Sequence, residues 1–413
     1  MSKMESGENK LRIVLICHFM NKAIQKKLGI DGDAKELSPW ISLGLEEIRK
    51  RNDIELYVVS PFAGILRNYS FHDANIHYYC IKVGIPFMRR YWPDWFRLND
   101  WSNYYFFNIQ VKRLVKRINP DLINLYGAEN AYYSSSILAI RGYPILVTIQ
   151  GFVSLNYEKN CINPRIRKRI QIEEKIIERQ KYFGVEASFM EKYIKTYNPY
   201  ARMFWFHCFF AKTNVNTHIC KEYDLVFFAR IYKLKGIEDL IKTVSVVKDR
   251  KPEIKLCIIG HADETYLNYL KTLVKKLSLD NNIVFKGFFP TQEEMHHEVV
   301  KARISVLPTY NDTIPGTIVE SMLLGVPVIS YNTGGIPDLN KDDENVILVD
   351  QGNIDKLAEE IIHLLDNPEK QKELSGKAMN YALKEFDNTN SINKMIKAYQ
   401  DVIKDFKNNL VLN

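Results

Sequence analysis

Residues 308–339 place two acidic side chains around a turn that opens a helix. Asp312 and Glu320 stand eight positions apart, and Pro315-Gly316 between them begins a helical run that ends at Gly325. The first backbone N–H groups of a helix have no partner inside it, so a helix start is a ready site for an anion. Carboxylates accept hydrogen bonds from hydroxyl groups. The segment therefore predicts a site for a sugar or a ribose beside an anion.

Two basic residues stand in a second loop that follows a predicted strand. The apolar run 225–228 leads into Arg230 and Lys235, and a helix is expected from about residue 237. Arg binds phosphate with two parallel hydrogen bonds, and Lys adds a mobile point charge. Together they could neutralise a diphosphate. The alternative is a solvated basic loop, but its position at the end of a strand favours the diphosphate site.

Further weak signals come from glycines at the ends of later predicted strands. Gly260 follows the run 256–259, and Lys286-Gly287 ends the next one. A glycine there lets the backbone approach a ligand closely, although a tight turn explains each of them equally well. The chain lacks G-x-G-x-x-G and a Walker A motif, which removes the main support for dinucleotide oxidoreduction and for P-loop hydrolysis.

Short apolar runs alternate with helical patterns along the whole chain. Such runs indicate parallel strands buried on both faces, and two successive series predict two doubly wound α/β domains. The boundary is expected near residues 205–222, and a terminal helix at about 391–413 could belong to either domain. The predicted strands are 13–17, 56–59, 122–125 and 145–149 in the first half, and 225–228, 256–259, 283–286, 304–307 and 326–330 in the second.

The composition is that of an ordinary globular protein. The chain has 413 residues, 46% of them hydrophobic and 26% charged, with a net charge of +8. No nucleic-acid motif accompanies the basic excess, so we expect no nucleic-acid partner. The six cysteines are scattered without a C-x-x-C pair, and no apolar stretch approaches the length of a membrane span. A cytoplasmic protein is expected, with attachment to the inner face of the membrane left open.

The second half of the chain, over residues 222–390, resembles the retaining glycosyltransferases of family 4, also called glycosyl transferases group 1. The resemblance rests on Arg230, Lys235 and Gly236, on the spacing of Asp312 and Glu320, and on the turn 315–318. Segments 334–338 and 364–386 also resemble the family. It implies the GT-B fold, in which two Rossmann-like domains face a central cleft. Residues 1–210 would then bind the acceptor and residues 222–390 the nucleotide-sugar donor.

The resemblance also implies roles for individual residues. Arg230 and Lys235 would bind the donor's diphosphate, and Asp312 would contact the donor sugar. Glu320 would contact the ribose, while the backbone of Pro315, Gly316, Thr317 and Ile318 would reach the phosphates. With Arg230, Lys235 and Asp312 in catalytic roles, we expect no metal and no cofactor, because the two cations replace the charge neutralisation of Mg²⁺. Asp312 is one methylene shorter than the family's usual Glu.

The first half resembles the family more loosely, at 121–127 and 147–151. Gln150 stands where the family often has His, and it can hydrogen-bond a sugar hydroxyl or a phosphate but cannot act as a base. His18 follows the first predicted strand, and Glu129 follows another, so both could line the acceptor side. For a single His near a strand end, a structural hydrogen bond is the commoner role. The adjacent pair His296-His297 points to different sides of a helix and does not suit a metal.

Residues 85–101 mix Arg with Trp, Tyr and Phe, and residues 165–169 form a second basic cluster. Aromatic rings with basic neighbours suit a membrane interface. The alternative is an internal loop whose rings pack on the core and whose charges are solvated. A lipid-linked acceptor would favour the membrane interpretation.

The sequence therefore predicts an enzyme that transfers a sugar from a nucleotide-diphosphate donor to an acceptor hydroxyl, and the family resemblance implies retention of configuration. The acceptor would be a saccharide or a lipid-linked saccharide, in polysaccharide or glycolipid synthesis. Two alternatives stay open, namely a nucleotide-sugar epimerase or hydrolase of the same fold, and a nucleotide-sugar binder without activity. Product formed from the donor alone would identify the first. Donor binding without turnover against any acceptor would identify the second.

Overall fold

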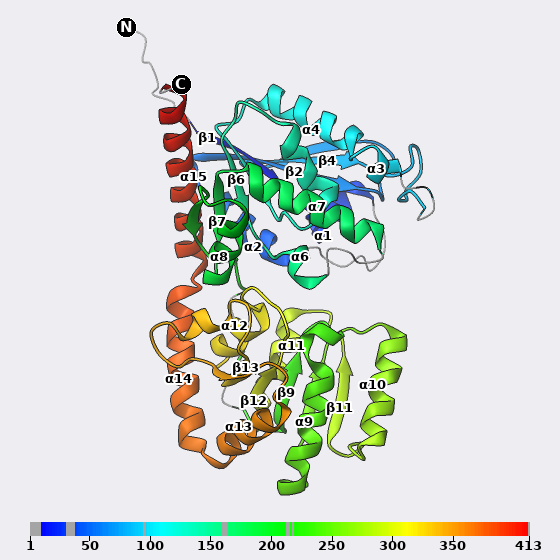
Figure 1. Cartoon of the computed structure of the whole chain (residues 1–413), viewed down its shortest axis with the longest axis vertical. Coiled ribbons are helices and arrows are strands. Elements are labelled where there is room, and N and C mark those ends of the chain that lie inside the picture. Colours follow the sequence, from blue (N-terminus) through cyan, green and yellow to red (C-terminus); the bar gives the residue numbers. More distant parts are fainter. Residues whose placement is uncertain are drawn as a thin grey trace. The chain divides into compact units, whose positions relative to one another are not determined.

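The computed structural model describes residues 10–29, 38–93, 96, 98–157, 163–211, 215–216 and 219–411 (Figure 1). The chain divides into two compact units. Unit 1 comprises residues 1–186, 190–209 and 388–413, and unit 2 comprises 187–189 and 210–387. Each unit holds one α/β sheet, so the predicted fold class is confirmed.

Unit 1 is built on an eight-stranded sheet in the order β3-β4-β2-β1-β5-β6-β7-β8. Its pairings are parallel except for the β3–β4 hairpin. The strands are β1 (Leu11–Ile16), β2 (Ile54–Phe62), β3 (Tyr69–Asp73), β4 (Ile76–Lys82), β5 (Leu122–Tyr126), β6 (Ile145–Thr148), β7 (Tyr182–Val185) and β8 (Arg202–Trp205). The helices are α1 (Lys22–Leu28), α2 (Pro39–Arg49), α3 (Leu98–Trp101), α4 (Tyr105–Ile118), α5 (Ala131–Ser134), the 3₁₀ helix η1 (Ser135–Ala139), α6 (Val153–Asn156), α7 (Pro164–Arg179), α8 (Ser188–Tyr197, which starts in unit 2) and α15 (Asn388–Val411).

The core of unit 1 joins its first strands to the last helix of the chain. Side chains of β1, β2 and α2 pack in one cluster with Ile392, Ile396 and Tyr399 of α15. The Tyr399 hydroxyl accepts a hydrogen bond from the amide of Asn124 at 2.8 Å, and the Thr148 hydroxyl donates to the amide oxygen of Asn124 at 2.9 Å. All three polar groups are buried, and the network satisfies them. The terminal helix thus completes the core of unit 1.

Unit 2 is built on a six-stranded parallel sheet in the order β11-β10-β9-β12-β13-β14. Counted along the unit, this is the 3-2-1-4-5-6 order of dinucleotide-binding folds. Strands are added toward one edge up to β11 and toward the other edge from β12 on, so the strand order reverses between β9 and β12. The strands are β9 (Tyr223–Phe228), β10 (Leu256–Ile259), β11 (Ile283–Gly287), β12 (Ala302–Leu307), β13 (Val328–Tyr331) and β14 (Ile347–Val349). The helices are η2 (3₁₀, Lys233–Lys235), α9 (Ile237–Arg250), α10 (Glu264–Lys276), α11 (Gln292–Val299), α12 (Gly316–Leu323), η3 (3₁₀, Ile336–Asn340), α13 (Ile354–Asp366) and α14 (Pro368–Glu385).

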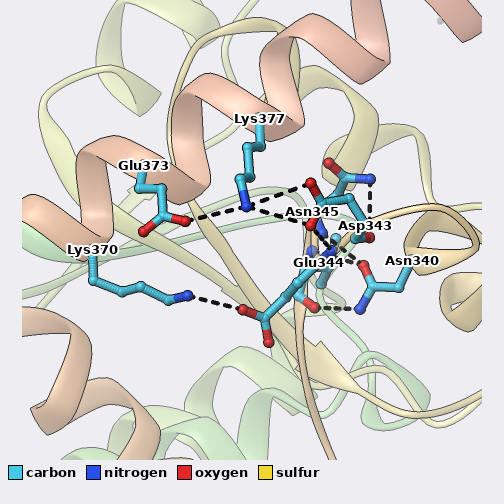
Figure 2. A network of polar contacts seen from close by, with 8 residues as sticks. Asn340, Asp343, Glu344, Asn345, Lys370, Glu373 and Lys377 are labelled. Atoms are coloured by element: carbon cyan, nitrogen blue, oxygen red, sulfur yellow. Dashed lines mark hydrogen bonds and ion pairs between the residues drawn. The ribbon is translucent and has the colours of Figure 1, made fainter.

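The loop before β14 is fastened mainly by amide side chains (Figure 2). The buried Asn345 donates to the carbonyl of Leu339 at 2.7 Å, and Asn340 donates to the carbonyl of Val346 at 2.7 Å. Ion pairs also join this loop to α14, at 3.1 Å for Lys370–Glu344 and 3.4 Å for Lys377–Asp343. Exposed pairs of this kind contribute little individually, so the buried amides are the main restraint.

Candidate functional site

The basic loop and the acidic loop of unit 2 follow neighbouring strands. Arg230 follows β9 and Asp312 follows β12, and these two strands pair side by side. They flank the point where the strand order reverses, which is where ligands of such sheets bind, beyond the carboxyl ends of the strands. The arrangement therefore supplies a candidate ligand site at this edge of unit 2.

Lys235 and Asp312 form an ion pair across these two loops. Their side chains are 17% and 20% exposed, so the pair is partly shielded from water without being closed off. Arg230 is exposed, and its guanidinium lies 5.8 Å from the centre of the Tyr232 ring. Two cations and a carboxylate thus come from the two predicted loops, and the Lys235–Asp312 contact brings the loops to one place.

Backbone contacts fix the two loops against each other. The N–H of Tyr310 donates to the carbonyl of Leu234 at 2.8 Å. Gly236 has a φ of 74°, and a Cβ there would lie 1.7 Å from the carbonyl oxygen of Pro308. A larger residue therefore has no room at position 236, and the close approach of the loops requires glycine. The ion pair is held on a preorganised backbone rather than by the two side chains alone.

A glycine pair holds the backbone of Asp312 from the other side. The N–H of Gly335 donates to the carbonyls of Asp312 at 3.2 Å and of Thr313 at 2.9 Å. A Cβ on Gly334 would stand 1.8 Å from the Asp312 carbonyl oxygen. The segment 334–338, which resembles the family in sequence, therefore positions the acidic loop through its two glycines.

The second acid, Glu320, lies on α12 and is held by two side chains of α11. Its carboxylate accepts a hydrogen bond from the amide of Gln292 at 3.0 Å, and the ring nitrogen Nε2 of His296 lies 3.2 Å from its other oxygen. Glu320 is 8% exposed. Helix α12 starts after Pro315 with no side chain capping it, and its first backbone bond runs from the N–H of Ile318 to the carbonyl of Pro315 at 3.0 Å. The preceding N–H groups, those of Gly316 and Thr317, have no acceptor within the helix. Glu320 is thus fixed in orientation beside a helix start.

The glycines after β10 and β11 lie together, whereas Lys286 has its own partners. The N–H of Gly260 donates to the carbonyl of Gly287 at 2.8 Å, and a Cβ on Gly260 would lie 1.9 Å from the carbonyl oxygen of Ala229. The ammonium of Lys286 pairs with Glu298 at 3.1 Å. Hydrogen bonding to Tyr223 and to Glu298 raises the pKa of Lys286. Tyr223 is the first residue of β9, so Lys286 is not gathered with Lys235 and Asp312.

The three candidates of unit 1 also follow neighbouring strands. His18 follows β1, Glu129 follows β5 and Gln150 follows β6, and β5 pairs with both of the other strands. In the amide orientation that satisfies both neighbours, Gln150 donates to a Glu129 oxygen at 3.3 Å and accepts from the indole N–H of Trp40 at 2.9 Å. The ring of His18 stacks at 6.4 Å from Tyr133, and burial lowers the pKa of His18.

Glu129 is the chemically unusual member of this group. Burial raises its pKa to about 7, and the nearby Glu173 acts in the same direction while Arg169 opposes it. Among the residues that the structure describes, none hydrogen-bonds its buried oxygen Oε2. The side chain of Arg169 also donates to the Glu129 carbonyl at 2.8 Å, which anchors the loop. Near neutral pH this carboxyl can both donate and accept a proton.

The two segments considered for membrane contact have mixed surroundings. In 85–101, Trp92 packs against Phe96 at 5.1 Å, whereas Phe87 and Trp101 are exposed. Asp94, Trp95 and Arg97 lie outside the described residues. In 165–169, Arg169 is turned inward to the Glu129 loop. Of the described residues, no helix is long and apolar enough to cross a membrane, and no three His, Cys, Asp or Glu gather closely enough for a metal ion.

Four residues that contact the candidate sites were not predicted. Gln292 and His296 orient Glu320, and Trp40 and Tyr133 contact Gln150 and His18. The sequence shows Thr291 and Glu294 at the spacing of a capping box, and the structure confirms that this box starts α11. That signal could have predicted where α11 starts. It could not have predicted that His296 of this helix lies against Glu320.

Comparison with known proteins supports the same assignment. Residues 211–381 match the family described as glycosyl transferases group 1. An uncharacterized glycosyltransferase of Haemophilus influenzae is 23% identical over 67% of this chain and 76% of its own length. The N-acetyl-alpha-D-glucosaminyl L-malate synthase of Bacillus anthracis is 23% identical over 46% of this chain and 51% of its own length.

Solved structures show the same fold over nearly the whole chain. The sucrose-phosphate synthase of Thermosynechococcus elongatus has a TM-score of 0.73 at 16% identity, covering 96% of this chain and 100% of that one. Anabaena Alr3699/HepE, solved with UDP and glucose, has a TM-score of 0.65 at 14% identity and covers 94% and 99%. The fold is therefore GT-B. The family match and the curated relatives identify residues 211–381 as a glycosyl transferases group 1 domain and the chain as a glycosyltransferase.

Proposed function

We propose that this enzyme transfers a hexose or a related sugar from a nucleotide-diphosphate donor to a hydroxyl of a saccharide or a lipid-linked saccharide, with retention of configuration. The observation that carries the proposal is the Lys235–Asp312 ion pair, which brings the basic loop and the acidic loop together where the strand order of unit 2 reverses. That edge is where a nucleotide would bind in this type of sheet. Polysaccharide or glycolipid synthesis is the matching role.

The donor's diphosphate would lie against Arg230, Lys235 and the start of α12. When the bond between the anomeric carbon and the diphosphate breaks, the electron pair leaves with the diphosphate, and the two cations stabilise the growing charge. The backbone N–H groups of Gly316 and Thr317 add to this, because a helix start favours negative charge. These groups supply the neutralisation that a divalent cation would otherwise give, so the reaction is proposed to need no metal.

The two acids would hold the donor's hydroxyl groups. Glu320, fixed by Gln292 and His296, would accept hydrogen bonds from the ribose. Asp312 would orient the transferred sugar, and its contact with Lys235 places it beside the diphosphate. Gly260 and Gly287 let the backbone of neighbouring loops come close to a nucleotide. Lys286 would contact the donor only if the donor extends beyond the site formed by Arg230, Lys235 and Asp312.

The acceptor would use the edge of unit 1 that carries His18, Glu129 and Gln150. As the acceptor oxygen attacks the anomeric carbon, its hydroxyl proton would pass to an oxygen of the departing diphosphate, which keeps the electron pair of the broken bond. Glu129, with a pKa of about 7 and an unpartnered buried oxygen, suits hydrogen bonding to that hydroxyl in either protonation state. Gln150, itself held by the indole N–H of Trp40, donates to the other oxygen of this carboxyl and helps to fix it.

A donor screen followed by a product analysis tests the proposal. The solved relative that contains UDP and glucose makes UDP-hexoses the first donors to screen, with GDP- and ADP-hexoses for comparison. A ligand at a hundredfold excess over its Kd stabilises the folded protein by about 2.7 kcal/mol, so one nucleotide series should raise the melting temperature clearly. The preferred donor should then glycosylate a saccharide panel, and NMR of the product should show the donor's anomeric configuration.

The outcomes separate the alternatives. Consumption of the donor at the same rate with and without an acceptor would instead indicate an epimerase or a hydrolase. Donor binding with no turnover on any acceptor would indicate a binder. A product with inverted configuration would overturn only the proposed retention. Because no metal is proposed, we expect full activity after divalent cations are removed with EDTA.

A further inference from the structure

Helix α4 of unit 1 has an outer face on which aromatic side chains precede basic ones. Its buried side consists of apolar residues such as Phe107, Val111 and Leu114. The exposed residues recur at intervals of three, four and seven positions, so they share the opposite side of the helix. We call them the α4 face: Tyr105, Phe106, Lys112, Arg113, Lys116 and Arg117. The helix contains no Asp or Glu, so its basic charges are not neutralised along the helix itself.

Two pockets that differ in their lining open beside this face. The first, of about 520 Å³, is lined largely by apolar and aromatic side chains, among them Leu66, Phe87, Trp92 and Phe106. The second, of about 410 Å³, is lined by Arg113 and Arg117 together with residues of the edge strand β3 and its neighbour β4. Asn68 and Gln110 line both pockets, and the amide of Asn68 donates to the oxygen of Gln110 at 2.7 Å. A mainly apolar pocket, whose lining also includes Arg67 and Lys82, thus adjoins a more polar pocket lined by two arginines of α4.

The aromatic rim of the first pocket is held outward by its own backbone. The ammonium of Lys82 donates to the carbonyls of Val83 at 2.6 Å and of Met88 at 2.8 Å. The N–H of Ile85 donates to the carbonyl of Arg90 at 3.1 Å, which closes the loop. On this fixed loop Phe87 is 89% exposed. A large ring kept in water on a well-fastened loop indicates a surface that is covered by something else in use.

The charge balance of the two units points to the sign of that partner. Unit 1 contains 35 Lys and Arg against 22 Asp and Glu, a net charge of +13, whereas unit 2 contains 22 against 27, a net charge of −5. The net charge of +8 on the whole chain therefore hides a strongly basic unit. A partner of this unit is expected to be anionic.

We propose that the α4 face and the rim formed by Phe87, Tyr91 and Trp101 dock onto an anionic lipid bilayer. The rings of the rim and of the first turn of α4 lie at the level of the headgroups and the upper acyl chains, where half-buried aromatic rings are most stable. The basic residues of α4 meet the headgroup phosphates. The Asn68–Gln110 bond marks the boundary between the apolar and the phosphate level. This surface lies beyond the transferase assignment and does not depend on it.

A bilayer fits these observations better than a nucleic acid. A protein that binds single strands stacks bases on rings interleaved with basic residues along a groove. Here the rings gather at the start of α4 and the cations at its end. Leu66, which lines the first pocket, and Met88, which follows Phe87 in the chain, are also exposed and offer no flat surface for stacking. Separated apolar and cationic levels match the layered chemistry of a membrane surface.

Sedimentation of the whole protein with vesicles tests the proposal without any substrate. We expect strong partition onto phosphatidylcholine vesicles that contain phosphatidylglycerol, at least about tenfold weaker partition onto phosphatidylcholine alone, and loss of binding at high salt. The variant K112Q/R113Q/K116Q/R117Q should bind the anionic vesicles about tenfold or more weakly. The matched control K394Q/K397Q/K404Q/K407Q removes the same charge from α15 of the same unit and should bind within about twofold of wild type.

A second variant tests the contribution of the exposed rings to vesicle binding. F87S/W101S changes two exposed side chains, so it should fold normally and lose several-fold in partition while keeping its dependence on anionic lipid. If wild type fails to sediment with anionic vesicles at low salt, or if the α4 and α15 variants bind equally, the proposal is wrong. Tight binding of single-stranded RNA that the α4 variant loses, with no vesicle binding, would assign the face to nucleic acid instead.

Discussion

The two units have similar sheets but arrange different chemistry at equivalent edges. In unit 2, Arg230 and Asp312 follow the two strands that flank the reversal of strand order. Lys235 forms a partly exposed ion pair with Asp312. In unit 1, His18 and Glu129 follow the two strands in the corresponding place, and the Glu129 carboxyl is buried with a pKa of about 7. One edge thus presents fixed charges, and the other presents a carboxyl near the point of neutrality. A charged leaving group and an uncharged hydroxyl require that difference.

The net charges of the two units do not match the charges at their candidate sites. Unit 1 carries +13 and unit 2 carries −5, although the two cations of the candidate diphosphate site belong to unit 2. Local arrangement therefore decides where a small anionic substrate would bind, whereas the net charge of a unit bears on the extended charged surfaces that it attracts. Much of the basic excess of unit 1 lies elsewhere, in part on α4.

The largest expected effect breaks the charged side of this comparison. Arg230→Ala should lower kcat by about a hundredfold or more, as the loss of one preorganised charge-stabilising group usually does. The measurement is turnover at saturating donor. Arg250→Ala, which removes an exposed charge at the end of α9, should stay within about twofold of wild type. Near wild-type kcat in Arg230→Ala would show that the diphosphate lies elsewhere.

The next prediction tests the neutral side, through the stability of the fold. The pKa of Glu129 is raised in the folded state, so its contribution to stability is complete below its unfolded pKa and is lost as the pH rises through about 7. Between about pH 4 and pH 8 the free energy of unfolding of wild type should fall relative to Glu129→Gln by up to ~3 kcal/mol. Denaturant titrations of both proteins measure it. The exposed Glu178→Gln should give no such difference, and a constant gap for Glu129→Gln would refute the buried carboxyl.

A third prediction compares close backbone approach in the two units. Gly260 in unit 2 and Gly142 in unit 1 both have positive φ, but a Cβ at 260 would lie 1.9 Å from the Ala229 carbonyl oxygen, whereas position 142 is open. Gly142→Ala should cost about 1 kcal/mol of stability through its φ alone. Gly260→Ala should cost about 1–3 kcal/mol more, since the backbone must also shift. Equal losses in thermal unfolding would mean that the crowding at Gly260 is relieved without cost.

The smallest effect sharpens the assignment of Glu320. Glu320→Gln should raise the KM for the donor about tenfold with little change in kcat, because a charged hydrogen-bond acceptor of the ribose is lost. His296→Gln keeps a donor near Glu320 but loses the fixed ring, and a rise of about threefold is expected. The double variant should add little to Glu320→Gln alone, since both act through one carboxylate. Full additivity would separate His296 from this function.

The central strands were predictable because they are continuous apolar runs. All nine predicted strands are present, with ends shifted by a few residues. The hairpin β3–β4 and the strands β7, β8 and β14 were missed. β3 is half exposed and polar, β8 has exposed ends, β7 contains a glycine, and β14 has only three residues. The edge strands β3 and β8 lack the two-sided burial that makes a run of apolar residues distinctive, whereas β7 is fully buried and too short to stand out.

The candidate site was predictable as a set of loops but not as a set of contacts. The strand-end position of the basic loop and the family resemblance together predicted one site for Arg230, Lys235 and Asp312. They could not show that Lys235 and Asp312 touch, because 77 residues separate them and the contact depends on Gly236 and Gly334. Nor could they show that Lys286, at a similar strand end, pairs with Glu298. Side-chain partners follow from packing, which no local pattern encodes.

The last helix of the chain has a consequence for the order of synthesis. Unit 1 needs α15 for its core, and α15 is made only after all of unit 2. Domains usually fold in the order in which they leave the ribosome. Here the unit encoded second can finish first, while the apolar side of β1, β2 and α2 waits for Tyr399 and its neighbours. A ribosome that stalls before residue 388 would leave the first unit with an open core, and that nascent chain would be a natural client for chaperones.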